Sequence, residues 1–448
     1  MKKANAISGF PEWLPEQRLI ELQILDRIRA KFELFGFTPI ETRAVEPLEQ
    51  LLSKGETDKE IYALRRLQAA GEDEESEFGL HFDLTIPLAR YVLQNQGYLN
   101  FPLKRYQMQK VWRGERPQEG RYREFYQADI DVIAAGELPL HFDAEMPWLL
   151  HETLQSLPIP PVRILINNRK ILEGFYRGLG IEDVQATLRT VDKLDKVGEE
   201  VVLAMLIDGV KLEKPAAQKC LEIARIRESD SSFADKVQAL GVRNELLDAG
   251  LHELTFVMDS LQTLPKGSIV ADLHIARGLD YYTGTVYEGC LEGHESLGAV
   301  CSGGRYDDLA SSDGKNKLPG IGVSIGVTRI LGYLFGKNLL HASRKTPSCV
   351  LVALPSEEKR AEANAVARLL RKRGICCEVF HLPQKYGKQI RYAERLGIPY
   401  VWFPEGQESS AHEVRDIRSG EQTPADAQTW TPPVEDLSVK ADFGEAPV

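Results

Sequence analysis

Four arginines lie close together in the segment WRGERPQEGRYREFYQ, residues 112–127, of a chain whose formal net charge is -11. A guanidinium group keeps its charge at any working pH, and its planar fork can pair with two phosphate oxygens at once. In the same segment Phe125 offers a flat surface on which a base could stack. These residue types predict a binding site for a nucleotide, with Phe125 under the base and Arg113 on a phosphate.

Other ways of binding a nucleotide or a metal have no support in the sequence. The three GK pairs at 314, 336 and 387 are followed by Asn, Asn and Gln, so no phosphate-binding GxxxxGK[ST] loop is present, and no GxGxxG stands at a strand-to-helix turn. The six cysteines form no CxxC and have no histidines at zinc-finger spacing. We therefore expect reduced thiols and no protein-bound metal.

The elements that must position the arginines follow from hydrophobic periodicity. The segments LKRYQMQKVWRG, from Leu103, and EFYQADIDVI, from Glu124, alternate with period two, and the turn-rich RPQEGRY lies between them. This pattern predicts a β-hairpin with a long basic loop. Trp112 and Arg113 end its first strand while Phe125 and Gln127 begin its second, so these side chains can converge on one face of a sheet.

The rest of the chain divides into recognisable segments. Apolar spacing predicts a helix over 15–35, and FTPIETRAVEP, residues 37–47, resembles a strand. A short strand ends near Asp83 and a helix follows it. Residues 181–264 are helical and polar, and strand-like GSIVADLHIA begins at Gly267. We interpret 181–264 as an inserted helical domain.

A second boundary falls near residues 343–348. Beyond it, strand-like and helix-like segments alternate as in a small α/β domain with a mostly parallel sheet, and the segment from Lys359 to Arg395 carries ten basic and three acidic residues. That charge pattern fits a solvated helix face as well as a nucleic-acid surface. Residues 431–448 lack periodicity and are expected to form a loose tail.

Nothing in the sequence indicates a membrane protein. The amino terminus has no apolar signal-like stretch, and no apolar run is long enough to span a bilayer. We therefore expect a cytoplasmic location.

The segment 112–127 and three further segments carry a family resemblance. WRGERPQEGRYREFYQ resembles motif 2 of the class II aminoacyl-tRNA synthetases, and GIGVSIGVTRI, residues 320–330, is similar to motif 3. HIARGLDYYTG (274–284) and AVCSGGRYDDL (299–309) resemble the two histidine-specific signatures of the histidyl-tRNA synthetase family. The resemblance extends from about residue 10 to about residue 430. It implies ATP-dependent activation of L-histidine to histidyl-adenylate, followed by transfer to the 3′ end of tRNA(His).

The resemblance also implies roles for individual residues. For ATP, it implies that Arg113 binds the α-phosphate, Glu115 the adenine amino group, Phe125 the adenine ring, and Arg121 and Arg329 the outer phosphates. For histidine, it places Asp83, Thr85 and Gln127 around the α-amino group, Asp131 and Tyr282 near the imidazole, Tyr281 in the pocket wall, and Arg277, with Arg113, at the reacting carboxylate and α-phosphate. For tRNA, it implies contacts by Arg116 and Gln118 with the acceptor end, and Lys385, Lys388 and Arg391 belong to the domain expected to bind the anticodon.

The implied fold is α+β. It consists of an antiparallel sheet flanked by helices, carried by residues 1–180 and 265–342, with the helical insertion at 181–264, an α/β anticodon-binding domain at 347–430, and the tail. The implied partners are L-histidine, ATP with bound Mg²⁺, tRNA(His) and a second copy of the chain, held through the catalytic core.

Two features depart from the family pattern. Glutamate is usual where this chain has Asp83 and Asp131, so both acids reach one methylene less far, and the usual proline of motif 1 is absent. Without the resemblance, Asp129 and Asp131 would be interpreted as the solvent face of a strand, and His81 and His274 as structural histidines. The alternatives are a non-catalytic relative, the regulatory subunit of ATP phosphoribosyltransferase, and a pure RNA-binding module.

Overall fold

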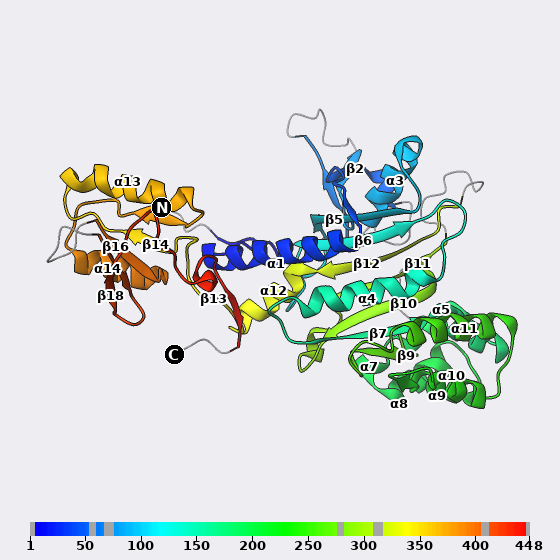
Figure 1. Cartoon of the computed structure of the whole chain (residues 1–448). Helices are drawn as coiled ribbons and strands as arrows, with labels where there is room; N and C mark the ends of the chain where they lie inside the picture. The colour runs from blue at the N-terminus through cyan, green and yellow to red at the C-terminus, as the bar shows by residue number, and fades with distance from the viewer. Residues whose placement is uncertain are drawn as a thin grey trace. The chain divides into compact units, whose positions relative to one another are not determined.

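The computed structural model describes residues 5–52, 60–66, 76–275, 282–307, 317–404 and 412–444 (Figure 1). Its contacts divide the chain into two compact units, Met1–Pro11 with Leu25–Tyr333, and Glu12–Ile24 with Leu334–Val448. Helices α1 (Pro15–Leu34) and α12 (Val327–Gly336) therefore contribute residues to both units. The helix expected over 15–35 is confirmed, and Gly36, with a φ of 78°, follows its end.

A nine-stranded sheet forms the centre of the first unit. The strand order is β1-β5-β6-β12-β11-β10-β7-β9-β8, and neighbours run antiparallel except for the pairs β1/β5 and β7/β9. The bounds are β1 Thr38–Pro39, β5 Leu103–Trp112, β6 Glu124–Ile133, β7 Val162–Asn168, β8 Arg227–Glu228, β9 Ile269–Asp272, β10 Tyr282–Leu291, β11 Cys301–Tyr306 and β12 Gly320–Gly326. The expected antiparallel sheet is confirmed in its central strands, and helix α4 (His141–Gln155) runs along it (Figure 1).

The predicted hairpin is confirmed, whereas the strand predicted before it is wrong. Strands β5 and β6 pair from Leu103↔Ile133 to Trp112↔Glu124. The residues 37–47 instead form two short strands in different sheets: β1 joins β5, and β2 (Val45–Pro47) belongs to a small sheet with β4 (Phe78–Leu80) and β3 (Tyr62–Leu64). A proline ends each of the two short strands, and its missing N–H limits how far a ladder can continue.

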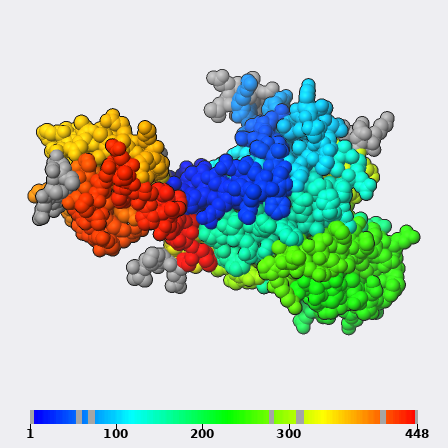
Figure 2. Space-filling model, in the orientation of Figure 1, coloured from blue at the N-terminus to red at the C-terminus, as the bar shows by residue number. Residues whose placement is uncertain are grey.

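Helices surround this sheet and fill the segment between β7 and β9. They are α2 Leu48–Leu52, α3 Thr85–Asn95, α5 Arg169–Gly178, α6 Val184–Val191, α7 Leu194–Val197, α8 Glu199–Ala204, α9 Lys214–Ala224, α10 Phe233–Ala239 and α11 Glu245–Ser260. Helices α5 and α11 approach closely because each contributes a glycine: a Cβ at Gly174 would lie 2.5 Å from the Leu247 nitrogen, and one at Gly250 2.7 Å from the Ile171 nitrogen. The segment 184–260 is helical, as predicted, and gathers at one end of this unit (Figure 2). Its limits as a separate domain stay a prediction.

The second unit carries a five-stranded sheet in the order β15-β14-β16-β17-β18. Its strands are β14 Val350–Val352, β15 Cys377–Val379, β16 Tyr400–Phe403, β17 Glu413–Asp416 and β18 Gln422–Pro424, and its helices are α13 Arg360–Lys372 and α14 Tyr386–Leu396. The first three strands are parallel, as expected, and the last two are antiparallel.

The expectation of a loose tail from residue 431 is wrong for residues 431–444. Strand β19 (Ala441–Phe443) pairs with β13 (Leu340–Ala342), and Val439 is buried. The Asp436 carboxylate accepts hydrogen bonds from Tyr400 and Arg418 at 2.8 Å. These contacts, which come from residues distant in sequence, hold the segment without any local periodicity.

None of the described helices is long and apolar enough to cross a lipid bilayer.

Candidate active site

Cross-strand pairing lines up the polar residues of the central sheet. Because side chains alternate along β6, Gln127, Asp129 and Asp131 face the same side. On β12 their partners are Gly326, Ser324 and Gly322, in that order. On β5 the residue paired with Asp131 is Arg105. The register therefore brings one amide, two carboxylates and one guanidinium to neighbouring positions on a single face.

Glycines on β12 and β11 leave open space beside these polar side chains. A Cβ at Gly322 would lie 2.0 Å from Asp131 Oδ1, and a Cβ at Gly304 would lie 2.9 Å from Tyr282 Cδ1. The space belongs to a cavity of about 100 Å³ whose lining is mostly polar. The lining residues are Asp83, Thr85, Arg113, Gln127, Asp129, Asp131, Tyr282, Ser302, Tyr306, Gly322, Val323 and Ser324. All the residues predicted to bind histidine that the structure describes meet here.

A second cavity, of about 230 Å³, adjoins the first. The two share four lining residues: Arg113, Gln127, Ser302 and Ser324. The second cavity is also lined by Glu115, Gly120, Arg121, Tyr122, Phe125, Ala299, Val300, Cys301, Gly326 and Arg329. Every residue predicted to bind ATP therefore lines this one cavity.

The arginines of the second cavity are held by local contacts. Arg113 Nε donates to the Phe82 carbonyl at 3.0 Å, and its guanidinium carbon lies 5.3 Å from the centre of the Phe125 ring. Glu115 pairs with Arg121 at 3.3 Å and approaches Arg113 at 3.9 Å. Arg329, on α12, donates to the Leu297 carbonyl. Three guanidinium groups and the Phe125 ring thus line the same cavity.

The acids of the first cavity are buried. Asp131 forms an ion pair with Arg105, a fully buried arginine, and accepts a hydrogen bond from the Tyr306 hydroxyl at 2.9 Å. Burial raises the pKa of Asp131 to about 6, against the opposing effect of Arg105. Burial also raises the pKa of Asp129 to about 7, with the neighbouring carboxylates adding to the shift. This part of the site is therefore acidic and attracts protons or cationic ligands.

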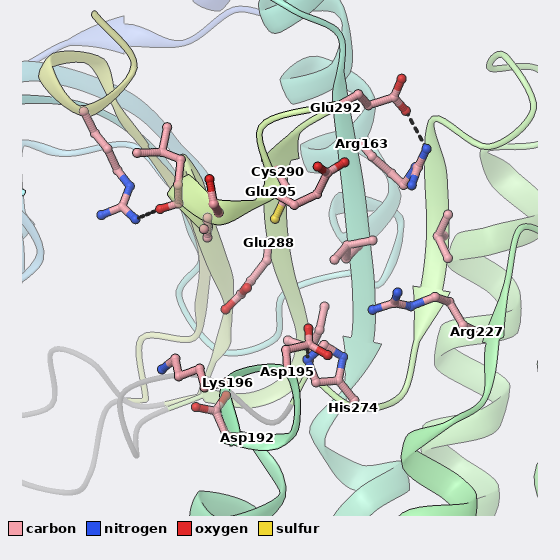
Figure 3. Close-up of a pocket in the computed structure, with 18 of the residues that line it drawn as sticks. Arg163, Asp192, Asp195, Lys196, Arg227, His274, Glu288, Cys290, Glu292 and Glu295 are labelled. Carbon is pink, nitrogen blue, oxygen red and sulfur yellow. Dashed lines mark hydrogen bonds and ion pairs between the residues drawn. The ribbon is translucent and has the colours of Figure 1, made fainter. Parts of the chain in front are cut away.

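A third and larger cavity, of about 1000 Å³, lies between the sheet and the helical segment (Figure 3). It shares Arg121, Ala299 and Arg329 with the second cavity. In Figure 3, Asp192, Asp195 and Lys196 line it from the helical segment.

At one side of the third cavity His274 lies between two carboxylates, with its Nδ1 2.9 Å from Asp272 and its Nε2 3.1 Å from Asp195. Burial alone would lower the pKa of His274, but these carboxylates outweigh it and raise the pKa above its ordinary value. The ion pair of Arg227 with Asp272 adds a second residue from the helical segment to this group. The expectation that His274 is a satisfied histidine agrees with these contacts.

Comparison with known proteins identifies the family of this chain. Residues 9–330 match the family model Histidyl-tRNA synthetase, and residues 348–430 match the model Anticodon binding domain. The chain belongs to the histidyl-tRNA synthetase family. It is 54% identical over 450 residues to the Histidine–tRNA ligase of Micrococcus luteus, with 98% of each chain covered.

Solved structures agree with this family. The histidyl-tRNA synthetase of a Nostoc species is 36% identical, superposes with a TM-score of 0.85, and is covered to 97%, against 94% of this chain. A Bacillus halodurans protein described as an ATP phosphoribosyltransferase regulatory subunit/histidyl-tRNA synthetase is 21% identical with a TM-score of 0.71, covering 88% of this chain and 96% of that one. At that identity it supports the fold alone.

The predicted tRNA-binding residues do not line the first two cavities. Arg277 and Tyr281 fall outside the described residues. Arg116 and Gln118 are exposed on the hairpin loop, and Gln118 also lines the third cavity. Lys385, Lys388 and Arg391 are exposed at the beginning of α14, in the second unit.

Sequence reasoning missed Arg105 and Tyr306, and it left Asp129 as a solvent-facing residue. Asp129 is in fact buried and lines the first cavity. The strand register brings Arg105 opposite Asp131, but the periodicity of one strand does not determine its register with the neighbouring strand.

Proposed function

We propose that this chain joins L-histidine to tRNA(His). ATP and histidine give histidyl-adenylate and pyrophosphate, and the histidyl group then passes to the 3′ end of the tRNA. The observation that carries this proposal is the pair of adjoining cavities that share Arg113 and Gln127. An adenylate contains both an amino acid and a nucleotide, so it needs two continuous sites of this kind.

On the nucleotide side, the proposed roles are those of an anion site. Arg113 holds the α-phosphate, and Arg121 and Arg329 hold the outer phosphates. Phe125 stacks on adenine, and Glu115 accepts a hydrogen bond from its amino group. The lining of the second cavity by all five residues supports these roles.

On the amino-acid side, Asp83, Thr85 and Gln127 surround the α-ammonium group. Gln127 Nε2 donates to Ser324 Oγ at 2.7 Å, which leaves the amide oxygen directed to other partners, and that oxygen has no hydrogen-bond partner among the residues that the structure describes. An acceptor of this kind suits an ammonium donor.

The imidazole and the reacting groups complete the proposed assignment. Asp131 and Tyr282 bind the imidazole, and Tyr281 lines the pocket. Arg277 lies by the carboxylate and the α-phosphate.

The chemistry requires positioning more than proton transfer. A carboxylate oxygen of histidine attacks the α-phosphorus in line, and the bond to pyrophosphate breaks. The attacking carboxylate is already ionised, so no general base is needed, and Arg113 and Arg277 stabilise the charge that develops on the phosphoryl oxygens. Mg²⁺ is proposed to enter bound to ATP. Within the described ranges no group of three His, Cys, Asp or Glu side chains is arranged to hold a metal.

The proposed partners follow the same division of the chain. The exposed Arg116 and Gln118 contact the acceptor end of the tRNA, and Lys385, Lys388 and Arg391 contribute to a basic surface for the anticodon region. We also propose that the enzyme is a homodimer through its catalytic core and works in the cytoplasm.

ATP–pyrophosphate exchange with each of the twenty amino acids tests the function. Exchange that depends on histidine alone is expected. A chain that binds histidine without any exchange would instead be a non-catalytic relative, such as the regulatory subunit of ATP phosphoribosyltransferase. The match of residues 348–430 to an anticodon-binding domain argues against that alternative, and the nucleotide cavity argues against a pure RNA-binding module.

A further inference from the structure

Two buried acids share one buried cation in the first cavity. Asp129 and Asp131 are both at least nine-tenths buried and both line the cavity. Among the described strand partners of these two acids, Arg105 is the one that carries a guanidinium, and it forms its ion pair with Asp131. The second oxygen of Asp131 accepts from Tyr306. Asp131 is therefore satisfied by the protein before any ligand binds.

Asp129 is not satisfied in this way. Its Oδ1 atom is buried and has no hydrogen-bond partner within the part of the chain that the structure describes. On β5 the neighbour opposite, Gln107, uses its amide donor on Thr42 and Gln109. On β12 the neighbour opposite, Ser324, interacts with Asp129 but also accepts from Gln127. An unpaired buried carboxylate oxygen is costly unless a ligand supplies the donor.

The position of Asp129 limits which donor can reach it. It stands between Gln127, assigned to the α-ammonium group, and Asp131, assigned to the imidazole, on the same face of β6. Asp131 Oδ2 pairs with Arg105 on β5, whereas Oδ1 lies beside Gly322 of β12 and accepts from Tyr306. An imidazole N–H that approaches Asp131 therefore meets a carboxylate whose two oxygens each already have one partner.

We propose that Asp129 is a further histidine-binding residue that determines specificity, its free Oδ1 accepting a hydrogen bond from a ring N–H of the bound histidine. Arg105 acts as a positioning residue by fixing Asp131 through their ion pair. This proposal rests on the proposed function. It gives the cavity a second acceptor that an amino acid without a ring N–H would leave unpaired, which is the condition for strong discrimination.

The test uses the full-length enzyme and ATP–pyrophosphate exchange. Asp129→Asn keeps the size of the side chain but replaces part of its acceptor capacity with a donor. We expect the KM for histidine to rise by about 10- to 100-fold, the effect of losing one charged hydrogen bond, while the KM for ATP changes by less than about threefold. Gln107→Ala is the matched control, because it removes a buried polar group from the same cross-strand row without touching the cavity. It should leave both KM values within about threefold of the parent, because the Gln107 amide binds Thr42 and Gln109 and does not line the cavity.

Thienylalanine separates the ring from the ammonium group, since it has a five-membered aromatic ring without an N–H. Its inhibition constant against histidine-dependent exchange should be the same in the parent and in Asp129→Asn. An equal rise for histidine and thienylalanine would assign Asp129 to the ammonium group and overturn the proposal. An unchanged KM for histidine would make Asp129 a structural carboxylate and overturn it as well. Absence of exchange in the parent enzyme would instead refute the proposed function.

Discussion

The two adjoining cavities differ in how far their charged side chains are exposed to solvent. In the nucleotide cavity the side chains of Arg113 and Arg121 are 32% and 46% exposed. Asp131, which lines the histidine cavity, and its ion-pair partner Arg105 are only 7% and 0% exposed. Exposed cations lose little hydration until a phosphate arrives. Buried acids have lost theirs already, and an unsuitable ligand leaves them unpaired. The comparison indicates that the nucleotide cavity would supply catalytic charge and the histidine cavity would supply selectivity.

Removal of Arg113 should have the largest effect. Arg113→Ala takes away a cation where charge develops in the transition state, so the rate of histidine-dependent pyrophosphate exchange should fall by about 100- to 1000-fold. Arg113→Lys should recover only part of the rate, because an ammonium group cannot reproduce the bidentate fork. Steady-state exchange kinetics measure both. A rate within a few-fold of the parent for Arg113→Ala would remove this residue from the chemistry.

A change confined to the histidine cavity should have a different signature. In Gly322→Ala the new Cβ would meet Asp131 Oδ1 at 2.0 Å and the Ile130 carbonyl at 2.9 Å, so the carboxylate must move. The KM for histidine should rise about tenfold or more, while the KM for ATP stays within about threefold. Gly97→Ala is the control, since nothing lies within 4 Å of the added Cβ. If both KM values rise together in Gly322→Ala, the two cavities do not act separately.

The sequence predicted one cavity better than the other for a physical reason. The nucleotide residues Arg113, Glu115, Arg121 and Phe125 all lie on one hairpin, so local periodicity was enough to bring them together. The histidine cavity depends on the register of β5, β6, β12 and β11, which is set by contacts between distant segments. That register alone places Arg105 and Tyr306 next to Asp131.

The same limit applied to the fold. Period-two and helical patterns located α1, the β5–β6 hairpin and the helices of the insertion, because each pattern is contained within one segment. They failed at residues 37–47 and 431–444, where pairing partners are far away in sequence.

The basic surface of the second unit should affect neither cavity. Replacing Lys385, Lys388 and Arg391 together by alanine should raise the KM for tRNA by about tenfold and flatten its dependence on salt, because phosphate contacts release counterions. Pyrophosphate exchange, which needs no tRNA, should stay at the parental rate. Aminoacylation assays at several salt concentrations measure the effect. A tRNA affinity insensitive both to salt and to these changes would assign another role to α14.

The smallest predicted effect concerns pH and the buried acids. Burial raises the pKa of Asp129 to about 7 and of Asp131 to about 6, while in the unfolded chain both take the ordinary value of 3.8. Between those values the native state binds more protons than the unfolded state, so the free energy of unfolding falls as the pH rises through that window. Asn cannot ionise, so this part of the pH dependence should be absent from Asp129→Asn. Between about pH 5 and about pH 8 the melting temperature of Asp129→Asn should therefore fall by less than that of the parent, the difference being on the order of 2 °C.

Thermal unfolding of the ligand-free enzyme across that window measures the difference. Asp26→Asn is the control, because Asp26 is an exposed acid, with 67% of its side chain accessible, and its removal should leave the pH dependence as in the parent. No such effect is expected from the nucleotide cavity, where the side chains of Arg113 and Arg121 are partly exposed. Parallel melting curves for the parent and Asp129→Asn would mean that Asp129 is ionised at about pH 5 despite its burial, and the contrast between solvated and desolvated charge would then not hold for this pair of cavities.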